Sequence, residues 1–150
     1  MENKEFKQLF NDIAKKHGFE SSFGGWFRDS NESIVALSLQ KSSFGNYYQL
    51  NIKIYFQGAF DRHYSKNKDL LNKDIGNIDR GEPKEYESFL ILDQRMDDSV
   101  RKKGLEALFN NFLVPFTDKA LTKKGLNELA KKGEIYLTPA IMEELSRLTK

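Results

Sequence analysis

The sequence predicts a single α+β domain spanning residues 1–150. We expect an N-terminal helix, an antiparallel meander of about four to five strands, and C-terminal helices packed on the sheet. Three observations lead to this fold class. Apolar side chains recur at three- and four-residue spacing near the N-terminus and again in the last third of the chain. Between these regions, apolar and polar side chains alternate with the two-residue period of strands. Strands that cluster before helices indicate an antiparallel sheet rather than a parallel, doubly wound one.

The first expected helix covers residues 3–17. Its apolar face is formed by Phe6, Leu9, Phe10 and Ile13. Gly18 follows directly, as a glycine often does at the C-terminal end of a helix. His17 lies in the last turn, where a histidine interacts favourably with the helix dipole. We therefore interpret His17 as a structural residue and not as a metal ligand.

Strands are expected at residues 26–28, 33–41 and 47–57, separated by turn-forming segments. The third of these has the clearest alternation in the chain. One face carries Tyr48, Leu50, Ile52, Ile54 and Phe56, and the other carries Tyr47, Gln49, Asn51, Lys53 and Tyr55. Such alternation predicts one face on the core and one face toward solvent or a partner.

Residues 58–85 form a long polar segment, which in a compact domain is usually functional or mobile. A short helical turn is expected near residues 69–71, and a strand near residues 76–79. The apolar run within residues 87–92 predicts a final strand.

The last third of the chain is expected to be helical, beginning with residues 99–113. Pro115 is expected to end or kink this helix, because proline lacks the N–H that the helix interior needs. Thr117 or Asp118 is the expected cap of the next helix. The final helix is expected to begin at Thr138, which a proline follows.

Composition excludes several kinds of chemistry. The chain has no cysteine, which excludes disulfides, thiolate metal sites and a thiol nucleophile. Two histidines offer little for a metal site, and no phosphate-binding glycine loop or metalloprotease helix motif is present. The sequence therefore predicts no metal, no cofactor and no catalytic residue. No window is apolar enough to cross a membrane, so a cytoplasmic location is expected.

Charge is nearly balanced, with 24 basic and 22 acidic side chains. The basic excess lies in residues 99–150, which hints at an acidic partner. The net charge of +2 is far below that of a dedicated nucleic-acid binder.

The outer face of the sheet is the principal candidate site. It is expected to present Tyr47, Gln49, Asn51, Lys53 and Tyr55 from the long strand. Depending on register, Ser38 and Gln40 from the second strand and Trp26 and Arg28 from the first lie alongside. Such a set suits a protein interface, where Tyr, Trp and Arg are enriched. It also suits stacking of bases and binding of phosphates in single-stranded RNA. A third interpretation is a solvated face, or one covered by the C-terminal helices.

Arg80 is a second candidate, because an arginine before a glycine in a long loop can clamp a carboxylate or phosphate. An ion pair with Asp74, Asp79 or Glu82 is the structural alternative. An enzyme with an acidic and arginine-containing site near this loop would use the same residues.

Several short runs resemble a known family. They are Gly18-Phe19, Trp26-Phe27-Arg28, the stretch from Leu39 to Ile52, and Asn77-Ile78-Asp79-Arg80. The chain resembles a family of small bacterial domains, the domain-of-unknown-function family 4304, over about residues 6–95. The resemblance implies the α+β fold and supplies no activity. Its matching polar positions are Gln40, Lys41, Asn51 and Arg80.

Together these observations predict a cytoplasmic binding domain, non-catalytic, that engages a protein partner through the outer sheet face or residues 58–85. The expected binding residues are Trp26, Arg28, Gln40, Tyr47, Asn51, Lys53, Tyr55 and Arg80. Nucleic-acid binding and catalysis stay as alternatives. A sheet edge can also pair with a second copy, so a homodimer is compatible with the sequence.

Overall fold

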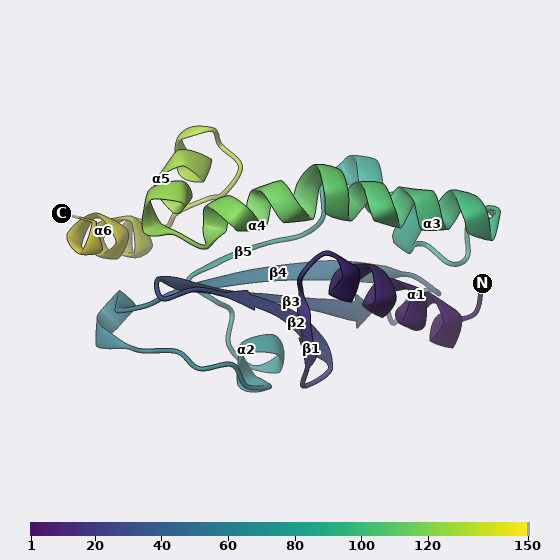
Figure 1. The fold of residues 1–150 in the computed structure, drawn as a ribbon, viewed down its shortest axis with the longest axis horizontal. Helices are drawn as coiled ribbons and strands as arrows, with labels where there is room; N and C mark the ends of the chain where they lie inside the picture. The colour runs from purple at the N-terminus through teal and green to yellow at the C-terminus, as the bar shows by residue number, and fades with distance from the viewer. Residues whose placement is uncertain (150) are drawn as a thin grey trace.

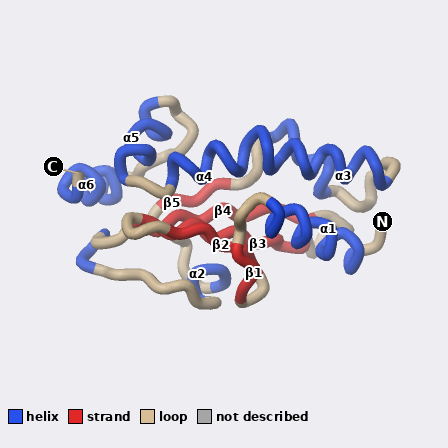
Figure 2. Tube along the Cα trace, viewed as in Figure 1, coloured by secondary structure: helices blue, strands red, loops and turns tan. Residues whose placement is uncertain are grey.

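The computed structural model describes residues 1–149 and confirms the α+β fold. Five antiparallel strands form one sheet in which every strand neighbours the next along the chain. The strands are β1 (Glu20–Ser22), β2 (Gly25–Asp29), β3 (Ser33–Lys41), β4 (Tyr48–Phe56) and β5 (Ile78–Arg80). Figure 2 shows this sheet as a central layer between helices.

The α-helices are α1 (Asn3–Lys16), α2 (Asp69–Asn72), α3 (Asp98–Ala107), α4 (Val114–Ala120), α5 (Lys123–Lys131) and α6 (Pro139–Leu148). Two 3₁₀ segments cover Ala59–Asp61 and Lys84–Leu90, and a π-helical segment covers Leu108–Leu113. The long helical rod from α3 to α4 lies on one side of the sheet, and α2 lies on the other (Figure 1). We call these the inner and outer faces of the sheet.

The helix α1 forms where the spacing of its aromatic side chains predicts it. Glu2 and Glu5 form a capping box at its start, and Gly18 follows its end with a positive φ of 87°. Phe6 and Phe10 are completely buried in the main core. There Phe10 contacts the rings of Trp26 and Phe109, which ties α1 to the sheet and to the long rod.

The alternation along β4 is also confirmed. Its inner-face residues Tyr48, Leu50, Ile52, Ile54 and Phe56 all belong to the main core. Each of the nine residues of β4 pairs with one residue of β3, which makes this the longest ladder of the sheet.

The strand predicted at residues 87–92 is wrong. Residues 84–90 form a 3₁₀ helix, and only an isolated bridge joins Ile91 to Tyr47. The buried guanidinium of Arg101 holds this segment by donating to the carbonyls of Phe89 and Ile91. The ring of Phe89 lies so close to Gly104 that an added Cβ would stand 2.2 Å from it. The apolar run within residues 87–92 therefore packs against α3 and does not form a strand.

Of the two effects expected of Pro115, ending the helix is wrong, because helical structure continues through it to Ala120. The π-helical segment directly precedes it, and its wider turns accommodate a ring that would clash with an α-helical carbonyl. Thr117 consequently lies inside α4 and is not a cap; Thr122 caps α5 instead. The predicted cap at Thr138 is confirmed, since its side chain accepts the N–H of Ile141.

Candidate functional site

The outer face of the sheet is divided into a covered half and an open half. The covered half consists of Phe27, Ile34, Ala36 and Tyr55, all buried. It is covered by Tyr64, Leu70 and Leu71 from the segment that connects β4 to β5. The C-terminal helices, which we considered as a cover for this face, lie on the inner face instead (Figure 1).

Lys53 and Tyr55, two of the predicted binding residues, are occupied within the covered half. The Tyr55 hydroxyl donates to the carbonyl of Leu70 over 2.7 Å. The Lys53 ammonium donates to the carbonyls of Leu71 and Asp74 over 2.9 and 2.7 Å. Burial raises the pKa of Tyr55 above its usual value, so its hydroxyl stays a donor. Both side chains hold the cover in place and are not available to a partner.

Trp26 and Arg28 lie on the inner face, which corrects their expected placement. They pair with Leu37 and Val35, whose side chains belong to the main core. The Trp26 indole donates to Asn11 of α1 over 2.9 Å. Arg28 donates to Thr117 and forms an ion pair with Asp118, each over 2.7 Å. Trp26 and Phe27 are both buried because both faces of β2 are covered, so apolar character could not identify the outer face.

Arg80 is also directed toward the helices. It pairs with the inner-face residue Ile52, and its guanidinium lies 4.8 Å from the ring centroid of Phe112. It donates to the carbonyl of Glu134 over 2.8 Å, and burial lowers its pKa. Among residues 1–149 it forms no ion pair with the three expected carboxylates. Arg80 therefore fixes the connection after α5, and it also lines a cavity that Gln40 and Asn51 border.

The open half belongs to a two-stranded extension of the sheet. Pairing of β2 with β3 stops at Leu37, and pairing of β5 with β4 begins at Ile52. Beyond these points, residues 38–41 and 48–51 pair only with each other. We call these eight residues the β3–β4 ribbon.

One face of the ribbon is polar and open. It carries Ser38, Gln40, Gln49 and Asn51, which we call the amide face. Gln40 and Gln49 are exposed, and the Asn51 amide donates to Gln40 over 3.1 Å. Tyr47 lies half-buried just before this face. Of the predicted binding residues, Gln40, Asn51 and Tyr47 lie on or beside this face. Four of them, Gln40, Asn51, Lys53 and Arg80, line one cavity at its border.

The helix α1 supports the ribbon from its inner side. The Tyr48 ring stacks on Phe6 with centroids 5.2 Å apart, and its hydroxyl accepts the side-chain amide of Asn3. Leu50 is completely buried beside it. The amide face therefore sits on a packed support and does not depend on loop conformation.

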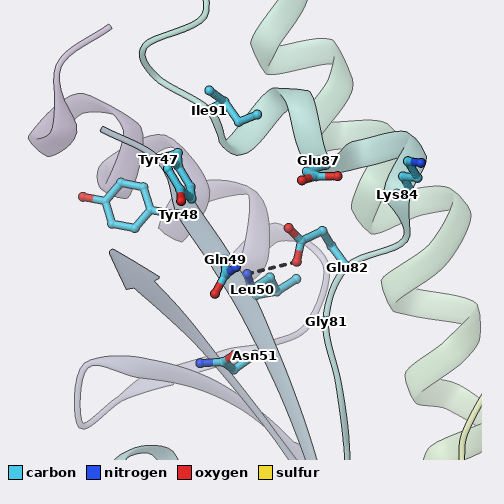
Figure 3. Close-up of a pocket in the computed structure, with 10 residues that line it drawn as sticks. All are labelled: Tyr47, Tyr48, Gln49, Leu50, Asn51, Gly81, Glu82, Lys84, Glu87 and Ile91. Carbon is cyan, nitrogen blue, oxygen red and sulfur yellow. Dashed lines mark hydrogen bonds between the residues drawn. The ribbon is translucent and has the colours of Figure 1, made fainter. Parts of the chain in front are cut away.

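A pocket of about 600 Å³ lies along the β4 edge of the ribbon (Figure 3). Glu82 reaches across it, and its carboxylate accepts the backbone N–H of Leu50 over 3.1 Å. Burial raises the pKa of Glu82 above its ordinary value. Glu87 and Lys84 line the same pocket, which therefore contains two carboxylates and one ammonium group.

Two further cavities border the ribbon. One, of about 360 Å³, is lined by Gln40 and Asn51 together with Lys53, Asp79 and Arg80. The other, of about 430 Å³, lies along the β3 edge beside Leu39 and Trp26. Surface cavities thus adjoin both edges and one face of the ribbon.

Within residues 1–149, no three histidine or acidic side chains cluster closely enough to hold a metal ion. No helix in that range is long and apolar enough to cross a membrane. The His17 ring stacks on Phe109, and its Nε2 lies 3.2 Å from a carboxylate oxygen of Glu106. These contacts give His17 a role in packing α1 against the α3–α4 rod.

The sequence interpretation missed Glu82. A carboxylate placed just after a short strand can accept an N–H that the strand no longer pairs, and Pro83 prevents the strand from continuing. This position between Arg80 and Pro83 was the available signal.

Comparisons with protein-family models, with curated proteins and with solved structures give no match. The resemblance to family 4304 stays a prediction. The function must therefore be argued from the geometry of this chain.

Proposed function

We propose that this protein is a non-catalytic binding module that engages a partner protein through the β3–β4 ribbon. The carrying observation is that the ribbon extends past the neighbouring strands with its amide face open. Amide side chains offer both donors and acceptors, which match the peptide groups and polar side chains of a protein surface. A cytoplasmic location fits the cysteine-free sequence.

A protein partner fits this surface better than a nucleic acid does. Base stacking needs exposed aromatic rings, yet Trp26 and Tyr55 are buried. The two cations predicted to bind phosphate, Lys53 and Arg28, are bonded within the protein. The amide face itself carries no charged side chain.

Glu82 is the one observation that favours an enzyme. Its pKa is raised by burial, and it lines the pocket on the β4 edge. Its carboxylate, however, already accepts the Leu50 N–H, and Arg80 is directed toward Phe112 and not into the pocket. The structure gives Glu82 a place in closing a sheet edge, which supports the binding role.

Photo-crosslinking tests the proposal. Benzoylphenylalanine introduced at Gln49 is expected to form a discrete, nuclease-resistant adduct with one protein in cells of the native host. The same group at Ala140, exposed on α6, serves as the control and gives no such adduct.

The captured protein, once identified and purified, is then titrated against variants. Gln40→Glu should weaken binding about tenfold, because it places a negative charge on the amide face. The control Ser146→Glu, which changes an exposed residue of α6, should leave affinity unchanged. Equal adducts at both positions, adducts with nucleic acid instead of protein, or unchanged binding by Gln40→Glu would refute the proposed function.

A further inference from the structure

The β3 edge of the ribbon leaves backbone hydrogen-bonding groups unpaired. Ser33 uses its carbonyl toward the β2 side, where it accepts the N–H of Ser30. Alternate residues of a strand direct their backbone groups to the same side, so Leu39 and Lys41 point away from β4. No strand lies there, because the pairing with β2 ends at Leu37. Among residues 1–149, Leu39 and Lys41 have no strand partner on that side, and no turn or loop backbone bond reaches them there.

The opposite edge of the ribbon is already closed. Glu82 accepts the Leu50 N–H in place of a strand, and Ile91 bridges to Tyr47. The pocket along that edge contains the carboxylates of Glu82 and Glu87 beside the ammonium group of Lys84. The two edges therefore differ in free backbone groups, and acidic side chains outnumber basic ones only along the β4 edge.

The surroundings of the β3 edge are cationic. Its cavity of about 430 Å³ is lined by Lys4 and Lys7 of α1 and contains no carboxylate among its lining residues. Lys4, Lys7 and Asn11 follow one another at three- and four-residue spacing, so they share the face of α1 that looks onto this edge. Neither lysine forms an ion pair in the described part of the chain. Lys41, exposed, adds a third cation at the end of the strand.

Trp26 and Leu39 supply the apolar part of the same cavity. A strand added beside Leu39 would direct alternate side chains toward this inner side and toward the amide face. Side chains on the inner side would meet Lys4, Lys7 and the indole. Those on the other side would meet neutral amides.

We propose that the β3 edge of the ribbon binds an extended, acidic segment of the partner protein by strand addition. Backbone bonds to Leu39 and Lys41 supply the pairing, and Lys4 and Lys7 select acidic side chains. This inference rests on the proposed function and names the partner's chemistry. A second copy of the chain is disfavoured, because a two-fold pairing of β3 edges would bring the lysines of both copies together.

Selection from a library of random peptides tests the inference directly. Peptides of about 12 residues, long enough to span the edge, are displayed and selected on the immobilised full chain. The enriched peptides should be rich in Asp and Glu and in strand-forming residues. Hydrogen exchange should then show slower exchange of the Leu39 and Lys41 amides when a selected peptide is bound.

Charge reversal provides the quantitative readout, by fluorescence anisotropy with a labelled selected peptide. Lys4→Glu with Lys7→Glu should weaken binding about tenfold. The control pair Lys102→Glu with Lys103→Glu, exposed on α3, makes the same change in net charge and should stay within about twofold. Leu39→Pro should also weaken binding, because it removes a donor that points away from β4 and leaves the β3–β4 ladder intact.

Enrichment of basic or neutral peptides, no enrichment at all, or equal losses in both charge-reversal pairs would overturn the inference. Slower exchange of the Leu50 amide instead of the Leu39 amide would place the peptide at the β4 edge and would also overturn the inference. The two proposals can be told apart. If the Gln49 adduct forms but charge reversal at Lys4 and Lys7 has no effect, the proposed function stands and the acidic strand at the β3 edge is refuted.

Discussion

Both halves of the outer sheet face include residues of β3 and β4, yet one half is covered by another segment of the chain and the other is open. In the covered half, Phe27 and Tyr55 are buried beneath Leu70 and Leu71. In the open half, Gln40 and Gln49 of the amide face are exposed. Backbone alternation is the same in both halves. The difference lies in side-chain chemistry and in the reach of one connecting segment.

Only the side chains that the fold does not itself use are available to bind a partner. The covered half contains the aromatic and cationic groups that suggested a binding surface, but the protein uses them to hold its own connection between β4 and β5. The open half contains neutral amides. Water satisfies their hydrogen-bonding groups while the face is exposed, and the same groups can bond to a partner. A chemically rich face is thus not the same as an available one.

The largest expected effect comes from removing the cover. Leu70→Ala should lower the free energy of unfolding by about 2–5 kcal/mol, because it leaves a cavity beside Phe27 and Tyr55. Gln49→Ala in the open half should change it by less than about 0.5 kcal/mol. Urea denaturation of both variants measures the contrast. Similar values would mean that the two halves do not differ in packing.

A smaller effect is expected where the two halves meet. Lys53→Met keeps a long, unbranched side chain but leaves the carbonyls of Leu71 and Asp74 without their donor. The free energy of unfolding should fall by about 1–2 kcal/mol. Amide exchange in residues 69–75 should become faster. The control Lys73→Met loses only an exposed ion pair with Asp69 and should cost less than about 0.5 kcal/mol. Equal costs would show that Lys53 does not secure the cover.

The smallest effect concerns Glu82 and depends on pH. Burial raises its pKa, so above pH 4.5, its ordinary value, the folded chain binds more protons than the unfolded chain. The stability contributed by this group therefore falls as the pH rises through the raised pKa. Glu82→Gln cannot ionise and keeps an acceptor for Leu50, so its stability relative to the wild type should increase over that range.

The expected gain stays below about 1 kcal/mol, since the carboxylate is half-exposed and screened by solvent. Thermal unfolding across pH 4 to 8 follows the difference, with Glu85→Gln as the control for net charge. A difference that shrinks as the pH rises would contradict the assigned cause of the shift.

Several elements could be predicted from local patterns alone. The apolar spacing in α1, the alternation in β4 and the cap at Thr138 each depend on near neighbours in the chain. The candidate site was predictable only in part: Gln40, Asn51 and Tyr47 lie where alternation placed them. Trp26 and Arg28 do not, because β2 is buried on both faces and its pattern contains no preferred side.

Alternation in β3 and β4 determined which side chains share a face, because successive residues of a strand point to opposite sides whatever surrounds them. Tertiary contacts decided which part of that face stays open. Leu70 and Leu71 are distant from Phe27 in the chain, and Glu82 meets Leu50 across 32 positions. Burial and edge closure depend on such long-range contacts, and the free energy that favours them appears only once the chain has brought the segments together.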